Sequence, residues 1–99
     1  MTVIEYVTFA LVPGTAEADF LAAATGTGAL VRRQPGFVAR RLSQGADGTW
    51  TDAVTWTSLA SAQAAAGAVM EDPAFTPFMA LIDGASARMR HETLALTLD

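Results

Sequence analysis

The sequence predicts an α+β fold in which strands and helices follow one another in the order β-α-β-β-α-β. Four stretches rich in β-branched and aromatic residues recur along the 99-residue chain. Between them lie two stretches with apolar residues at helical spacing, one in each half. Proline, glycine and Asp-Gly turn signals mark the junctions. This order is typical of the split βαβ, or ferredoxin-like, arrangement, in which two helices cover one face of a four-stranded antiparallel sheet.

The first half of the chain is expected to form a strand, a helix and a second strand. The first strand spans residues 2–12 (TVIEYVTFALV) and ends at a Pro-Gly turn. Thr15 is placed to cap the helix that follows, and two acidic residues occupy its first turn, where the helix dipole favours them. The residues at helical spacing are Phe20, Ala24, Thr27 and Val31. A Gln-Pro-Gly sequence at 34–36 ends this helix, and the second strand spans residues 37–44 (FVARRLSQ).

The second half repeats the order strand, helix, strand. Asp47-Gly48 predicts a hairpin turn, because this pair tolerates positive φ, and a third strand over residues 49–57 (TWTDAVTWT) follows it. Ser58 is placed as the N-cap of a helix that runs to about Met70, before a proline breaks it. A further short helical segment is predicted by Phe75, Phe78, Met79, Leu81 and Ile82. The set interpreted as core or pocket lid is Met70, Phe75, Phe78, Met79 and Ile82. Residues 88–98 (RMRHETLALTL) are expected to form the fourth strand.

Composition narrows the class of protein. The length suits one domain over residues 1–99, and 52% hydrophobic with 16% charged residues excludes intrinsic disorder. No apolar run approaches the roughly 18 residues of a membrane span, and without a recognisable signal peptide a cytoplasmic location is expected. The absence of cysteine excludes disulfides and thiolate zinc sites, and a single histidine argues against a transition-metal site. A net charge of −4 argues against nucleic-acid binding.

Both faces of the first predicted strand are largely apolar. One face carries Val3, Glu5, Val7, Phe9 and Leu11, and the other carries Ile4, Tyr6, Thr8, Ala10 and Val12. Two helices can cover only one face of the sheet, and no other part of the chain is left for the second. The simplest cover is a second copy of the sheet in a twofold homodimer. The alternative is an unusually apolar face that stays open to solvent.

Four motifs carry a resemblance to a known family. They are Phe20-Leu21 in the first helix, Gln34-Pro35-Gly36-Phe37 before the second strand, Trp56-Thr57-Ser58 before the second helix, and Asp72-Pro73-Ala74-Phe75 with Phe78 after it. In these motifs the chain resembles the dimeric α+β barrel superfamily, closest to its antibiotic-biosynthesis-monooxygenase-like branch. The resemblance implies dimers of ferredoxin-like subunits with their sheets face to face. Members include cofactor-independent monooxygenases of aromatic polyketides, quinol oxygenases, haem-degrading enzymes and proteins with no known reaction.

The chain departs from this branch in its second helix. Members often carry a histidine there, whereas residues 64–67 of this chain are Ala-Ala-Ala-Gly. A haem-degrading role is therefore not expected. The resemblance implies instead oxidation of an aromatic or quinol-type small molecule without a cofactor or a metal. The alternative is a non-catalytic small-molecule binder or structural protein of the same fold, because a fold alone does not decide function.

His91 and Glu5 are the candidate catalytic residues. Histidine is the side chain that titrates nearest to neutral pH, so His91 is the default general base for a phenol. If the fourth strand pairs with the first, Glu5 lies across from His91 or diagonal to it. Otherwise His91 simply occupies a polar edge between Arg90 and Glu92. Glu5, inside an apolar strand, either pairs with Arg88 or Arg90 or lines a polar cavity.

Several aromatic side chains could stack on a planar aromatic substrate. The candidate substrate-binding residues are Trp50, Trp56, Tyr6 and Phe78, with Asp52 as their polar neighbour. Alternation puts both tryptophans and Asp52 on one face of the third strand. Ordinary core packing is the other explanation for these rings. The pairs Arg32-Arg33 and Arg40-Arg41 are interpreted as surface ion pairing, although one arginine of the second pair could meet an anionic ligand or a partner subunit.

Overall fold

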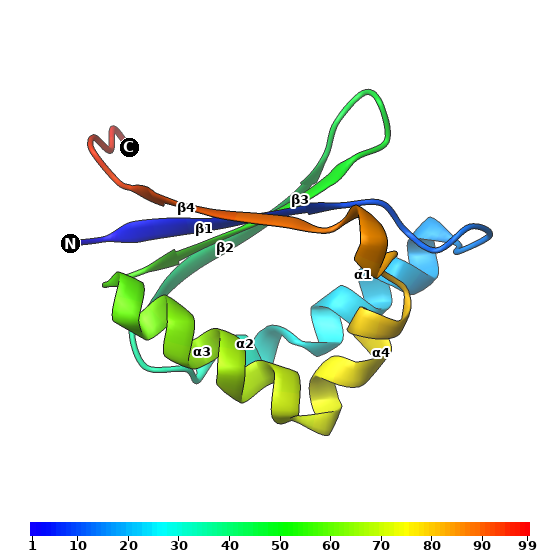
Figure 1. Cartoon of the computed structure of the whole chain (residues 1–99), viewed down its shortest axis with the longest axis horizontal. Helices are drawn as coiled ribbons and strands as arrows, with labels where there is room; N and C mark the ends of the chain where they lie inside the picture. The colour runs from blue at the N-terminus through cyan, green and yellow to red at the C-terminus, as the bar shows by residue number, and fades with distance from the viewer.

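The structure, a computed structural model, describes all 99 residues and places the helices on one side of a four-stranded sheet (Figure 1). The strands are β1 Val3–Phe9, β2 Phe37–Gln44, β3 Trp50–Trp56 and β4 Arg88–Thr93, in the spatial order β2-β3-β1-β4 with antiparallel neighbours. The helices are α1 Glu17–Gly26, α2 Gly28–Arg32, α3 Leu59–Glu71 and α4 Thr76–Ala80, with 3₁₀ turns η1 Pro73–Phe75 and η2 Gly84–Ser86. The predicted α+β ferredoxin-like fold is confirmed.

The tight turn between β2 and β3 sets the register of the sheet. Gly48 has a φ of 88°, and the Asp47 carboxylate accepts a hydrogen bond from the backbone N–H of Thr49 at 2.9 Å. This bond favours the ionised carboxylate and holds the pKa of Asp47 below its usual range. From this turn the ladder pairs Arg40 of β2 with Val54 of β3, on the face that the helices cover.

Two hydrophobic clusters pack between the helices and the sheet. One consists of Val3, Leu30, Val31, Val54, Trp56, Ala62, Ala65 and Val69, and the other of Phe9, Phe20, Ala24, Trp50 and Phe78. The predicted helical stripe of Phe20, Ala24, Thr27 and Val31 is buried throughout. Removing such side chains from water contributes about 25 cal/mol per Å² of apolar surface, which holds the helices on the sheet.

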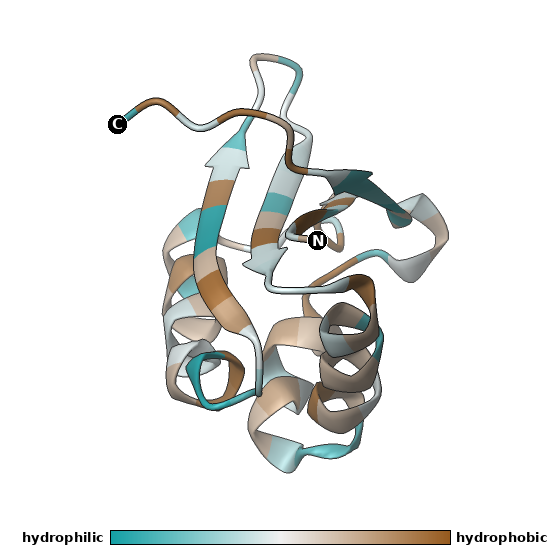
Figure 2. Ribbon diagram, turned by 90° about the vertical axis from the view of Figure 1, so that its left-hand side faces the viewer, coloured by the Kyte–Doolittle hydropathy of each residue, from teal (hydrophilic) through white to brown (hydrophobic).

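Several elements differ from those expected. The N-cap of α1 is Ala16 and not Thr15, whose hydroxyl donates instead to a backbone carbonyl three residues earlier. The first helix is divided into α1 and α2 at Thr27, which lies between two helix-weakening glycines. The first and last strands of the chain are shorter than expected, with β1 ending at Phe9 and β4 at Thr93. The last residues leave the sheet as an exposed, largely apolar tail (Figure 2).

The opposite face of the sheet carries no helix (Figure 1). Its two central strands contribute partly exposed residues, namely Ile4, Tyr6, Thr8, Thr51, Ala53 and Thr55. Arg90 of β4 lies over the ring of Tyr6, with its guanidinium carbon 4.3 Å from the ring centre. The expectation that the helices leave one face of the sheet uncovered is confirmed.

Candidate active site

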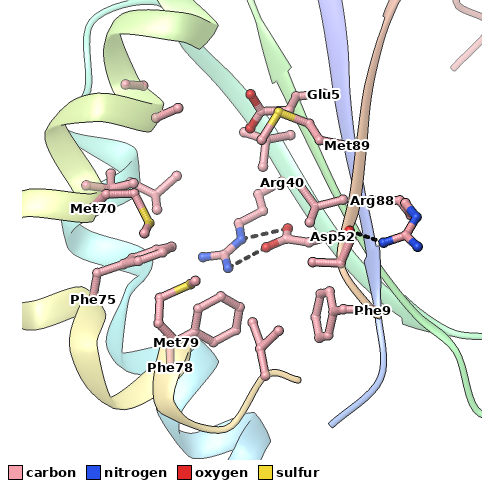
Figure 3. A pocket seen from close by; sticks show the side chains of 18 of the residues that line it. Glu5, Phe9, Arg40, Asp52, Met70, Phe75, Phe78, Met79, Arg88 and Met89 are labelled. Atoms are coloured by element: carbon pink, nitrogen blue, oxygen red, sulfur yellow. Dashed lines mark hydrogen bonds and ion pairs between the residues drawn. The ribbon is translucent and has the colours of Figure 1, made fainter. Parts of the chain in front are cut away.

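A cavity of about 470 Å³ lies between the helix-facing side of the sheet and helices α3 and α4 (Figure 3). Fifteen of its 19 lining residues are hydrophobic, which makes it an apolar site with a few polar groups. Met70 of α3 and Met89 of β4 line it and are each more than half exposed, so they mark its opening. The volume falls in the range of about 300 to 1,000 Å³ that small-molecule pockets occupy.

Glu5 is the acidic residue of β1 that faces this cavity. The pairing of β1 with β4 sets Glu5 directly opposite His91, and His91 Nε2 lies 3.0 Å from Glu5 Oε2. The side chains of His91 and Glu5 are 25% and 11% exposed. The second carboxylate oxygen, Oε1, has no hydrogen-bond partner in the chain. Glu5 lines the cavity and His91 does not, so the imidazole holds the carboxylate from outside the cavity wall.

Neither arginine that the sequence offered as a partner for Glu5 reaches it. Arg88 donates to the backbone carbonyls of Ala85 and Ala87, and Arg90 forms an exposed ion pair with Glu92. Of the two expectations for Glu5, the ion pair with an arginine is therefore wrong. The carboxylate instead lines a cavity, and most of the wall of that cavity is apolar.

The second polar group in the cavity wall is the ion pair between Arg40 of β2 and Asp52 of β3 (Figure 3). Arg40 Nε and Nη2 donate to the two Asp52 oxygens at 3.0 and 2.8 Å, and Nη1 donates to Thr27 Oγ1 at 2.7 Å. The guanidinium carbon also lies 5.4 Å from the centre of the Phe78 ring. Since Arg40 binds both of its oxygens, Asp52 is a partner for the guanidinium and has no free carboxylate oxygen.

The structure brings some of the predicted site residues together and separates others. Glu5, Asp52, Trp56 and Phe78 line the cavity, and His91 contacts Glu5. The Trp56 indole N–H is buried without a hydrogen-bond partner. Trp50 does not line the cavity, because its ring packs in the core 4.8 Å from that of Phe20. Tyr6 lies on the opposite face of the sheet and faces away from the cavity.

From the sequence, one arginine of the Arg40-Arg41 pair could meet an anionic ligand, but which of the two was open, and the hydroxyl of Thr27 was not expected in the site. The interpretation of Arg40-Arg41 as surface ion pairing is wrong for Arg40, whose side chain is only 14% exposed. A signal was present, because the Asp47-Gly48 turn makes Arg40 and Asp52 diagonal neighbours on one face of adjacent strands. Thr27 gave no such signal. Its position among apolar residues at helical spacing predicts a buried side chain, but not that its hydroxyl accepts a hydrogen bond from Arg40.

The chain has no group of three or more His, Asp or Glu side chains that could together ligate a metal ion. No helix combines the length and the hydrophobicity that a membrane crossing requires.

The open antiparallel sheet with helices on one face, and the apolar cavity between them, are those of a small ferredoxin-like α+β protein. The chain is similar to SnoaB from Streptomyces nogalater, a cofactor-independent oxygenase, at 25% identity and a TM-score of 0.74, over 98% of this chain and 96% of SnoaB. No family model and no curated protein matches the sequence.

Two further solved structures are similar in fold alone. A candidate antibiotic biosynthesis monooxygenase from Bordetella bronchiseptica has 18% identity and a TM-score of 0.82, over 96% of this chain and 98% of its own. Another from Caulobacter crescentus has 15% identity and a TM-score of 0.73, over 96% of this chain and 91% of its own. Together with SnoaB, these matches confirm that the chain resembles antibiotic-biosynthesis-monooxygenase-like proteins in fold.

Proposed function

We propose that the protein is a cofactor-independent, monooxygenase-like enzyme that oxidises a small aromatic phenol or quinol. The observation that carries the proposal is the carboxylate of Glu5, which holds one oxygen against His91 and has the other free at the wall of an apolar cavity. A carboxylate in this position can remove a proton from a bound hydroxyl group. The likeness to SnoaB, itself a cofactor-independent oxygenase, supports the same class of reaction.

The proposed reaction draws all its electrons from the substrate. Glu5 Oε1 accepts the phenolic proton, and the electron pair of the broken O–H bond delocalises into the ring. The carbanion form transfers electrons to dioxygen, and a C–O bond forms at a ring carbon that carries hydrogen. Loss of that hydrogen as a proton, together with cleavage of the O–O bond, leaves a carbonyl group and releases water. A phenol and dioxygen thereby become a quinone and water, with no external reductant.

Each residue of the wall has a role in this proposal. His91 holds Glu5 in place and is positioned to share the proton that Glu5 accepts. Trp56 and Phe78 provide flat apolar surfaces for the ring. The two exposed methionines at the opening have flexible side chains that can adapt to the shape of the ligand.

Oxygen uptake with a panel of naphthols and quinols tests the proposal. Glu5→Gln preserves the shape of the side chain and removes the base, so turnover is expected to fall by about 10² to 10⁴-fold. Glu17→Gln, an exposed carboxylate on α1, is the matched control and should leave turnover unchanged. Binding of panel compounds by the wild-type protein without any oxygen consumption would overturn the enzymatic proposal and favour a non-catalytic binder.

The homodimer is a further part of the proposal. The uncovered face of the sheet has an apolar centre of Ile4, Tyr6 and Ala53, flanked by threonines. An apolar core with a polar rim is typical of protein interfaces, and a second copy on a twofold axis would bury this face against itself. We also propose a cytoplasmic location, which fractionation of cells that express the protein would test.

A further inference from the structure

We infer that Arg40 is a specificity-determining residue that binds a second oxygen of the ligand, conjugated with the hydroxyl group at Glu5. This inference rests on the proposed function, because it names the polar pattern that the same cavity selects. The ligand would be a planar phenol with an acceptor oxygen, such as a ketone, at the far end of its conjugated system. Phenols without that oxygen would bind more weakly.

The first argument is the unused bonding capacity of Arg40. A guanidinium carries five N–H groups, and Arg40 uses three of them, two for Asp52 and one for Thr27. One N–H on Nη1 and one on Nη2 are left over, in a side chain that lines the cavity and is only 14% exposed. Buried donors without partners are costly, so a ligand oxygen that accepts from them is favoured.

The second argument is the register of the sheet. Glu5 of β1 and Arg40 of β2 both pair with Val54 of β3, so the three residues form one row across the inner face. Neighbouring strands lie about 4.8 Å apart, which sets the two backbones about 10 Å apart with Val54 between them. Figure 3 shows Glu5 apart from the Arg40–Asp52 pair, in a wall of which 15 of 19 residues are hydrophobic. From this row the Arg40 guanidinium reaches diagonally to Asp52 and Thr27, so a flat ring system over Val54 has the Glu5 carboxylate on one side and the guanidinium on another.

The third argument is the movement of charge. When Glu5 removes the phenolic proton, negative charge delocalises through the ring to the conjugated oxygen. Fixed donors aimed at developing charge stabilise it strongly in a cavity that contains little water. The guanidinium is held by two residues and by the Phe78 ring, so it needs no reorganisation to receive this charge.

Equilibrium binding under anaerobic conditions tests the inference without turnover. The probe is 6-hydroxy-1-tetralone, whose hydroxyl is conjugated with a ketone. The matched probe is the phenol 5,6,7,8-tetrahydro-2-naphthol, called tetrahydro-2-naphthol below, which lacks the ketone. Wild-type protein is expected to bind the hydroxytetralone more tightly by about tenfold to a hundredfold, the range of one hydrogen bond to a charged group. The near-ultraviolet absorbance of the bound ketone is expected to shift toward that of its phenolate.

Three variants assign this preference to Arg40. Arg40→Met/Asp52→Leu removes both charges together, so that neither is left buried alone, and is expected to abolish the preference while tetrahydro-2-naphthol still binds. Arg40→Lys, which keeps one cation, should restore part of it. Arg41→Met, on the opposite face of the same strand, is the control and should retain it fully. The inference is overturned if wild type shows no preference, or if the double variant retains it or weakens both probes equally.

These outcomes are independent of the proposed reaction. A preference that depends on Arg40, with no oxygen uptake for any phenol, would retain the binding role and overturn the monooxygenase proposal. Oxygen uptake that depends on Glu5, with no preference between the probes, would retain the enzyme and overturn the role of Arg40.

Discussion

Two hydrogen-bonded pairs each place a carboxylate at the wall of one apolar cavity, and the two carboxylates differ in how many of their oxygens are free. Asp52 gives both oxygens to Arg40, whereas Glu5 gives one oxygen to His91 and keeps the other. The first pair is therefore suited to binding and to holding the sheet together, and the second to proton transfer. The difference follows from the partners, because a guanidinium can bind both carboxylate oxygens and an imidazole nitrogen binds one.

The Arg40–Asp52 pair is expected to matter for stability mainly when one partner is removed. Asp52→Ala leaves the guanidinium buried without its counter-ion, which costs about 3 to 5 kcal/mol of unfolding free energy. Arg40→Met/Asp52→Leu removes both charges and should recover most of that loss. Urea unfolding of the two variants and wild type measures the difference. Equal destabilisation by both variants would contradict this account of the pair.

His91 is expected to act through Glu5. His91→Ala should lower kcat by about 10² to 10⁴-fold while leaving the oligomeric state unchanged. Because one residue orients the other, Glu5→Gln/His91→Ala should be no slower than Glu5→Gln alone. Steady-state oxygen uptake across the three variants gives the answer. Losses that multiply in the double variant would show that the two residues act independently.

At the scale of elements, local signals predicted most of the chain. Ser58 caps α3 as expected, with its hydroxyl accepting from the Ser61 N–H at 3.0 Å, and the Asp47-Gly48 hairpin forms. The expected cap at Thr15 failed because its hydroxyl satisfies a nearby carbonyl instead. The last strand ends at Thr93. Leu94 donates one more backbone hydrogen bond to Thr2, and Leu96 and Leu98 are exposed beyond it.

The candidate site was harder to predict than the fold because it depends on contacts between distant segments. Glu5 and His91 could be identified because a carboxylate is rare in an apolar strand and the chain has one histidine. Their direct pairing needed the β1–β4 register, which the sequence left as opposite or diagonal. Arg40 needed the hairpin register and the burial of Thr27 together, and neither signal alone distinguishes it from Arg41.

Gly36, just before β2, lies in close contact with residues at the start of α3. Its φ is 87°, and an added Cβ would lie 2.5 Å from Ser61 Oγ and 2.8 Å from Thr57 Oγ1. Gly36→Ala is expected to lower the unfolding free energy by more than the roughly 1 to 3 kcal/mol of backbone strain alone. Gly48→Ala, with a φ of 88° and open space around it, is the matched control. Thermal unfolding compares them, and equal losses would mean that the contact with α3 is unimportant.

At the scale of the whole molecule, the two faces of the sheet should respond differently to a new charge. Phe9 is 2% exposed between the sheet and the helices, so Phe9→Asp buries an unpaired carboxylate in the core and should unfold the chain. Circular dichroism measures this loss. A folded Phe9→Asp protein would show that the assignment of the inner face is wrong.

A new charge on the uncovered face of the sheet is expected to leave the chain folded. Ala53 lies on β3 between Tyr6 of β1 and Arg41 of β2, at the centre of the face that no helix covers. In a twofold dimer the centre of this face packs against the centre of the same face on the second copy. Ala53→Asp therefore brings two carboxylates close together on an apolar surface. The variant is expected to remain folded and to become a monomer, because its helix-facing core is unchanged. Size-exclusion chromatography with light scattering distinguishes the two states. A wild-type monomer, or an Ala53→Asp dimer of unchanged stability, would show that something other than a face-to-face copy accounts for the apolar centre of this sheet.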